Sequence, residues 1–215
     1  MKTSSIACLF LALCFSTQAM AWERVFKFDD DPEDVPPDGF VIEAPPDARP
    51  MVVVQRDEKA PTKPNVLAMR GYNHFHLNSV VCLAWFSNIK DGEISVRFCH
   101  GGELETARTV GLVWRSQQGK VYSLEWDTLK SQIALIATLD GKRKELEKEE
   151  KVAIAANVWT TLSVKFQGDK ITCKINDKQI MAVENSQIGG PGKVGLCIQA
   201  DANIYFDNFR ISSEE

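Results

Sequence analysis

Residues 158–177, VWTTLSVKFQGDKITCKIND, decide the fold class of this chain. Two runs in this stretch, residues 159–166 and 171–175, alternate apolar and polar side chains, and the Gly168-Asp169 pair between them is typical of a turn. Alternation with a period of two puts every second side chain on the same face of a β-strand. The stretch therefore predicts a β-hairpin with one buried face.

The same pattern recurs along the chain. Short apolar or alternating runs, separated by Gly, Asp and Asn pairs, cover residues 51–55, 65–69, 92–98, 109–115, 121–126, 133–139, 179–183, 194–198 and 204–211. Many short strands with almost no helical pattern predict an all-β antiparallel sandwich or barrel. We expect its core to contain Ile94, Val96, Phe98, Leu162, Val164, Phe166, Ile171, Ile175, Leu196 and Phe206.

One segment is open to two interpretations. Residues 142–156, KRKELEKEEKVAIAA, could form a solvated helix with ion pairs four residues apart, or a polar extension of a hairpin. The charged run is short and flanked by strand patterns, which favours the hairpin extension.

The N-terminus has the pattern of a secretory signal peptide. Lys2 is followed by the apolar residues 6–15 and by Ala19-Met20-Ala21, an A-x-A cleavage signal. The apolar run is too short to span a bilayer, and no later run reaches the roughly 20 apolar residues of a membrane helix. We expect residues 1–21 to be removed and the protein to be secreted or periplasmic, without a membrane span.

The remaining residues, 22–215, have the length of a single β-sandwich domain. Its first segment, residues 22–50, is rich in proline: six of the nine prolines of the chain lie in residues 29–50. Because proline donates no backbone hydrogen bond, we expect residues 29–50 to form extended loop rather than sheet interior.

Charge and motifs exclude several function classes. The chain has 25 Lys and Arg against 29 Asp and Glu, and its net charge of -4 argues against a nucleic-acid partner. The sequence has no G-x-S-x-G, P-loop, H-E-x-x-H or G-x-G-x-x-G motif, so serine-nucleophile, nucleotide and zinc-protease chemistry lose their usual support. The oligomeric state has no sequence signal.

Four cysteines, Cys82, Cys99, Cys173 and Cys197, follow the signal peptide. An even number in an exported chain suggests disulfide bonds, and the lack of a C-x2-C pair argues against structural zinc. Alternation places Cys173 inward and Cys99 and Cys197 outward. Cys99–Cys197 is therefore the preferred disulfide, although three connectivities are open.

Several segments, taken in order, resemble a known family. GLVWR (111–115), VYSLEWDTL (121–129), DGKR (140–143), residues 158–177, and GKVGLCIQADANIYFDNFRI (192–211) are similar to the 3-keto-disaccharide hydrolase-like domains of the concanavalin A-like lectin/glucanase superfamily. The resemblance implies a jelly-roll sandwich of two antiparallel sheets with a glycan or polysaccharide as partner. Family members commonly carry an Asn-Tyr-Tyr turn after GLVWR, of which this chain keeps only Tyr122.

A pair of carboxylates is the signature of a glycoside hydrolase. Glu125 and Asp127 stand two residues apart, which puts both on one face of a strand about 7 Å apart. They resemble half of the E-x-D-x-x-E strand of family 16 glycoside hydrolases, but Lys130 stands in place of the second Glu. Glu125 and Asp127 are thus either candidate catalytic residues or two solvated carboxylates on an outer face.

Four residues are candidates for ligand binding. Arg97 and Arg115 are expected on the outer face, where they could bind sugar hydroxyls or form a structural ion-pair network with Glu125 and Asp127. Trp85 is a candidate stacking surface, and Tyr122 is the Tyr retained from the family turn. Trp114 and Trp126 have the parity of core residues.

Metal sites have weak signals. His74 and His76 point to one side of a strand but lack an identifiable third ligand, and His100 is isolated. Asp207, in FDNF, is expected to fix the terminal strand, with calcium binding as its alternative role. We expect no other cofactor.

Three functions fit these observations. The first is an exported carbohydrate-binding module without catalytic machinery. The second is a glycoside hydrolase acting on 3-keto-disaccharides or related glycosides, with Glu125 and Asp127 as acid and base. The third is a structural sandwich with no ligand.

Overall fold

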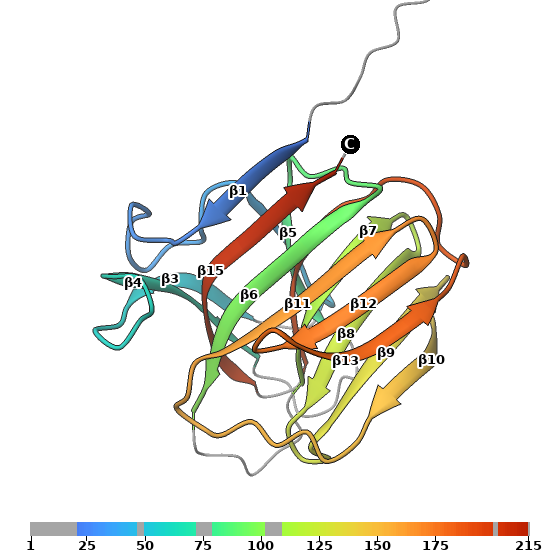
Figure 1. Ribbon diagram of the computed structural model, residues 1–215. Helices are drawn as coiled ribbons and strands as arrows, with labels where there is room; N and C mark the ends of the chain where they lie inside the picture. Colours follow the sequence, from blue (N-terminus) through green and yellow to red (C-terminus); the bar gives the residue numbers. More distant parts are fainter. Residues whose placement is uncertain (1–20, 47–49, 72–78, 102–108, 200–201, 215) are drawn as a thin grey trace, which may run out of the picture.

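A computed structural model describes residues 21–46, 50–71, 79–101, 109–199 and 202–214. These residues form two antiparallel β-sheets and no helix, and within them no helix is long and apolar enough to cross a membrane. The sheets stack face to face, so that β6, β11, β12 and β13 lie in front of β7, β8, β9 and β10 in Figure 1. The fold class is the all-β sandwich predicted from the sequence.

The first sheet has eight strands. Its order is β13 (Lys178–Glu184), β12 (Lys170–Ile175), β11 (Thr160–Gln167), β6 (Gly92–His100), β15 (Asn203–Ser213), β4 (Asn65–Arg70) and β3 (Met51–Arg56), and β1 (Trp22–Phe26) also pairs with β15. The hairpin expected in residues 158–177 is β11–β12, with Phe166 paired to Ile171.

The second sheet has seven strands. Its order is β10 (Lys142–Glu149), β9 (Gln132–Leu139), β8 (Lys120–Asp127), β7 (Thr109–Gln117), β14 (Lys193–Gln199), β5 (Val80–Ala84) and β2 (Phe40–Glu43). β7 and β8 thus lie well inside the sheet, while β10 and β2 form its edges.

The core lies between the two sheets, as the alternation predicts. Nine of the ten expected core residues are buried, and Ile175 is half-buried against the same cluster. Aromatic rings join the sheets: Phe98 of β6 packs on Trp126 of β8 at 5.9 Å, and Trp114 of β7 stacks on Phe166 of β11 at 6.0 Å between ring centroids. Trp114 and Trp126 are core residues, as expected from their parity.

Three strands escaped the sequence analysis because their patterns are weak. β1 carries two charged residues in five, β5 (VVCLA) is apolar throughout without alternation, and β2 lies within the proline-rich segment. The expectation of extended loop in residues 29–50 is therefore wrong for Phe40–Glu43, although β2 is an edge strand and stays out of the sheet interior.

The charged segment after Gly141 is a strand, which confirms the hairpin extension. β10 pairs with β9 and has a register shift between Glu145 and Glu147. Seven of its eight residues are Lys, Arg or Glu on an exposed strand edge alongside a bulge, features that discourage pairing with another chain. Its position brings Arg143 onto the sheet beside β9.

Asp207 fixes the terminal strand. Its Oδ2 accepts hydrogen bonds from the backbone N–H and hydroxyl of Thr62, and its Oδ1 accepts one from the N–H of Asn208. β15 has a register shift here, between Asp207 and Arg210. Burial raises the pKa of Asp207 despite these bonds. The calcium role stays a prediction.

The preferred disulfide, Cys99–Cys197, is wrong. Cys99 lies on β6 and Cys197 on β14, so the two outward-facing thiols belong to opposite outer faces of the sandwich. Cys82 and Cys173 point into the core, as predicted for Cys173. All four of these cysteines are buried free thiols.

Thiol chemistry tests this arrangement. Burial raises the pKa of Cys82 and Cys173 to about 12, and only a thiolate reacts readily with maleimide. The native protein should therefore resist labelling at neutral pH, whereas denaturation without reductant should expose all four thiols to the reagent. Peptide mapping by mass spectrometry gives the readout. Two cysteines that stay unlabelled until a reductant is added would contradict the structure.

Candidate functional site

Glu125 and Asp127 share the outer face of the seven-stranded sheet, as their spacing predicts. Trp126, the residue between them on β8, points into the core and is 2% exposed. Alternation therefore sends the two carboxylates to the opposite side. On this face Glu125 lies in line with Gly111 of β7 and Ala134 of β9.

Glu125 is held in an ion pair rather than solvated. Its Oε2 lies 2.7 Å from Nη2 of Arg143, and its Oε1 accepts a 2.7 Å hydrogen bond from the hydroxyl of Ser123. Because Arg143 belongs to β10, its side chain reaches across β9 to make this contact. Glu125 is only 5% exposed, so the expectation of a solvated carboxylate is wrong for this residue.

The pair sets the electrostatics of its surroundings. Burial alone would lower the pKa of Arg143, but the hydrogen bond and charge of Glu125 outweigh it and raise that pKa. Burial, then the charge of Glu125, raises the pKa of the neighbouring Cys197 thiol well above its usual value. Cys197 is therefore a neutral, inert thiol beside a charged pair.

Asp127 is engaged by the turn that follows β8. Its Oδ1 accepts hydrogen bonds from the backbone N–H groups of Leu129 and Lys130, both 3.1 Å long. Its Oδ2 lies 3.0 Å from Nζ of Lys130. Lys130, which replaces the second Glu of the hydrolase motif, thus forms an ion pair with Asp127.

Two hollows adjoin the Glu125–Arg143 pair, and both residues line each of them. The first, of about 210 Å³, has Val81, Val113 and Val121 among its lining residues together with Ser79, Ser123 and Thr138; we call it the valine hollow. The second, of about 140 Å³, is lined by Thr109, Asp127, Lys130, Gln132 and Glu145 among others; we call it the polar hollow. The face therefore combines an apolar floor with donors and acceptors.

Glycines allow the strands to pack closely beside the Glu125–Arg143 pair. A Cβ on Gly111 would collide with the carbonyl oxygen of Leu124 and approach Sγ of Cys197 to 3.1 Å. Gly195, on the next strand, is similarly close to the carbonyl oxygen of Cys82. Larger residues at these positions would displace the strands on which Glu125 and Cys197 lie.

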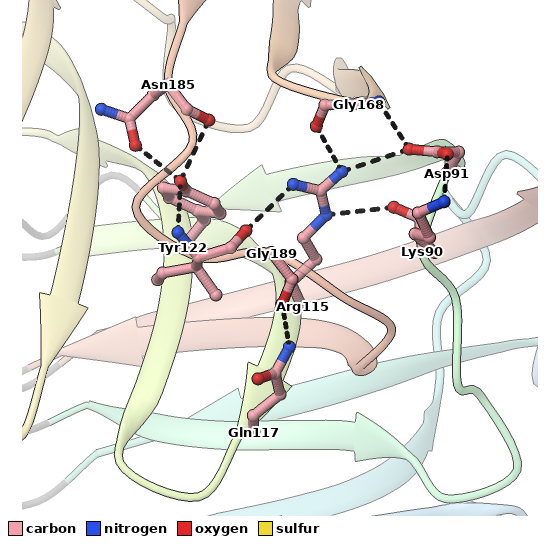
Figure 2. A network of polar contacts seen from close by, with 9 residues as sticks. Lys90, Asp91, Arg115, Gln117, Tyr122, Gly168, Asn185 and Gly189 are labelled. Atoms are coloured by element: carbon pink, nitrogen blue, oxygen red, sulfur yellow. Dashed lines mark hydrogen bonds and ion pairs between the residues drawn. The ribbon is translucent and has the colours of Figure 1, made fainter.

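Arg115 does not project from the outer face, and that expectation is wrong. Its side chain is 2% exposed, and its guanidinium donates to the carbonyl oxygens of Lys90, Ile188 and Gly168. A further contact of 3.2 Å joins it to Asp91 (Figure 2). The cause is local: Arg115 has a φ of 48° and sits where the β7–β8 register shifts, so strand alternation stops at this residue.

Tyr122 is also part of the interior rather than of the outer face. It is 0% exposed and stacks on Trp114. Its hydroxyl donates to Oδ1 of Asn185 at 2.6 Å (Figure 2). The same hydroxyl accepts from the backbone N–H of Ile188. Arg115 and Tyr122 together hold the loop that precedes β14.

Arg97 and Trp85 lie far from Glu125. Arg97 is half-buried on β6, in the eight-stranded sheet, where its parity directs it to the other outer face of the sandwich. Trp85 is 61% exposed at the end of β5, three strands away from β8 in the same sheet. Of the sequence-predicted site residues, only Glu125 and Asp127 therefore share the candidate face, while Arg115 and Tyr122 meet at the buried loop before β14.

Arg143 and Ser123 are the site residues that the sequence analysis missed. Arg143 belongs to the DGKR motif, and the sequence does not indicate which residue pairs with its charge. The registers of β10 with β9 and of β9 with β8 place it beside Glu125. Ser123 shares the parity of Glu125, and this signal could have found it.

Histidines contribute nothing to this face in the described part of the chain. His100 is buried against Trp126, with Nδ1 and Nε2 within 3.2 Å of the carbonyl oxygens of Gly101 and Ile154. His74 and His76 lie outside the described residues. Within the described ranges, no group of three or more His, Cys, Asp and Glu side chains is placed to hold a metal ion.

A family model described as a 3-keto-alpha-glucoside-1,2-lyase-like domain matches residues 70–212. The chain belongs to this family. The match covers both β8 and β10, and hence the Glu125–Arg143 pair. No curated protein matches the chain.

Solved structures with the same architecture include proteins that bind or process carbohydrates. Carbohydrate-binding module CBM66 from Bacillus subtilis superposes with a TM-score of 0.61 at 14% identity, covering 80% of this chain and 94% of that one. The apo Crh5 transglycosylase gives 0.57 at 10% identity, covering 92% and 85%. A β-1,3-1,4-glucanase from a mouse hindgut metagenome gives 0.51 at 11% identity, covering 90% and 99%. The fold is thus the concanavalin A-like jelly roll shared by binding modules and glycosidases.

The Arg115 network makes a prediction about stability. Arg115→Ala leaves Asp91 and three carbonyl oxygens without their buried donor, and should lower the free energy of unfolding by about 3 kcal/mol. Arg97→Ala, which removes the same side chain from a half-buried position, should change it by no more than about 0.5 kcal/mol. Urea denaturation of both variants measures the difference. Equal effects would show that Arg115 does not organise these loops.

Proposed function

We propose that this protein is an exported carbohydrate-binding module, and that it binds glycan on the outer face of the seven-stranded sheet around Glu125 and Arg143. The observation that carries the proposal is the charged pair beside an apolar floor. A sugar hydroxyl both donates and accepts hydrogen bonds, so a carboxylate next to a guanidinium can bind adjacent hydroxyls.

The lining of the hollows supports a sugar rather than an apolar ligand. Serine and threonine side chains lie beside valines in the valine hollow, and threonine and glutamine side chains line the polar hollow. Sugar rings present C–H groups as well as hydroxyls, and such a mixed surface matches both. Arg143 keeps donors for a ligand, because its side chain is 38% exposed and only Nη2 contacts Glu125.

The state of the carboxylates favours binding over hydrolysis. A glycosidase needs one carboxyl group that carries a proton and a second that acts as base or nucleophile. Glu125 is bound by a guanidinium and a hydroxyl, and Asp127 by Lys130 and two backbone N–H groups. These contacts hold both groups as acceptors.

The family description supports a catalytic alternative. A lyase acting on a 3-keto-glucoside needs a base to take the proton at C2, next to the ketone; the C–H electron pair then forms the C1–C2 double bond as the C1 substituent leaves. Among the lining residues, Glu125 is the carboxylate common to both hollows, and it would have to be the base. Loss of turnover of 3-keto-glucosides in Glu125→Gln would support this alternative.

A glycan array followed by calorimetry tests the binding proposal. The full chain should bind at least one glycan without turnover. Arg143→Ala and Glu125→Gln should each weaken binding at least tenfold, because each removes a charged hydrogen-bonding group. Lys144→Ala, the matched control on the same strand but of opposite parity, should bind as the original protein does.

Two different results would contradict the binding proposal. Cleavage of the bound glycan, or of a 3-keto-glucoside, would replace the binding module with an enzyme. A folded, cooperatively melting protein that binds no glycan would leave a structural sandwich with no ligand.

Export has its own test. When the chain is expressed in a bacterial host that processes signal peptides, the protein recovered outside the cytoplasm should begin at Trp22, because Ala19-Met20-Ala21 precedes it. N-terminal sequencing gives the answer. Recovery of an uncleaved chain from the cytoplasm alone would contradict the proposal.

A further inference from the structure

The guanidinium of Arg143 separates two binding spaces. Its side chain starts on β10, opposite Thr138 of β9, and ends at Glu125 of β8. The valine hollow and the polar hollow share these two charged residues as their common border. A ligand longer than one sugar ring that occupies both hollows must therefore pass over the pair.

The guanidinium of Arg143, at the border of the two hollows, can donate a hydrogen bond to the glycosidic oxygen that links two sugar units. A glycosidic oxygen accepts hydrogen bonds and donates none, and a guanidinium donates and accepts none. Arg143 has five N–H donors, and one of the two on Nη2 binds Glu125. Because the Arg143 side chain is 38% exposed, its remaining donors can bind the oxygens of a chain that crosses the border.

The charge of the two hollows selects against acidic sugars. Four acidic side chains line them, Glu43, Glu125, Asp127 and Glu145, against the two basic side chains of Lys130 and Arg143. Arg143 and Lys130 are each already paired with a carboxylate. A uronate or sulfate group would therefore meet net negative charge and no unpaired cation among the lining residues.

We infer that the two hollows are adjoining subsites for units of a single uncharged glycan, which lies across the Glu125–Arg143 pair. This inference rests on the proposed carbohydrate-binding function and adds the length and charge class of the ligand. The valine hollow takes the unit that presents its C–H face, because Val81, Val113 and Val121 line it. The polar hollow takes a unit held by hydroxyl contacts to Gln132, Asp127 and Lys130.

Calorimetry on the full chain tests the inference with defined probes. The probes are the mono-, di- and tetrasaccharides of a β-1,3-glucan, a β-1,4-glucan and an α-1,4-glucan, with oligogalacturonates as the acidic series. The disaccharide or tetrasaccharide of at least one neutral series should bind at least tenfold more tightly than its monosaccharide. Oligogalacturonates of equal length should bind at least tenfold more weakly than that neutral glycan.

Blocking variants separate the two subsites. Thr138→Tyr places a ring in the valine hollow, and Gln132→Tyr places one in the polar hollow; both residues are half-buried on β9. Each variant should remove most of the advantage of the longer glycan. Thr172→Tyr, on the outer face of the eight-stranded sheet, is the control and should bind normally. Thermal melting confirms that all three variants are folded.

The outcomes distinguish this inference from the proposed function. Binding that is equal for the mono- and tetrasaccharide, or lost in only one blocking variant, would overturn the two subsites while leaving carbohydrate binding in place. Tighter binding of oligogalacturonate would overturn the charge argument. If no probe binds and the glycan array is blank, the proposed function fails and the inference fails with it.

Discussion

The alternation of side chains along β8 is the constraint on which both the core and the candidate site depend. Tyr122, Leu124 and Trp126 are buried between the sheets, and this burial sends Ser123 and Glu125 to the outer face. A shift of one residue in the register would exchange the two sets and bury a carboxylate among aromatic rings. The packing of Trp126 on Phe98 and His100 therefore also positions the Glu125 carboxylate.

Arg115 and Arg143 have opposite roles in this sandwich, although the residues around them in the sequence give little indication of the difference. Arg115 is enclosed by the carbonyl oxygens of Lys90, Gly168 and Ile188 and ties loops together. Arg143 extends over an open sheet face with part of its guanidinium exposed. The difference lies in access to water, because an enclosed guanidinium uses its donors on the protein and an exposed one keeps donors for a ligand.

The same face could support binding or chemistry, and the contacts of its carboxylates decide which is better supported. Ion pairing and hydrogen bonds engage both Glu125 and Asp127 as acceptors, which suits recognition of hydroxyl groups more than proton donation. The family of 3-keto-alpha-glucoside-1,2-lyase-like domains and the jelly-roll architecture are compatible with both roles. The proposal of a binding module thus rests on this chain's own side chains.

The sequence by itself determined the sandwich, most of its strands, the core parity and the shared face of Glu125 and Asp127, because these follow from a local period of two. Only the tertiary structure decided which side chains contact one another. Cys99 and Cys197 have the same parity but belong to different sheets, so parity could not pair them. Arg115 left its expected face because a register shift and a positive φ interrupt alternation there. Arg143 joined Glu125 from 18 residues away because strand order, which is set by long-range pairing, places β10 two strands from β8.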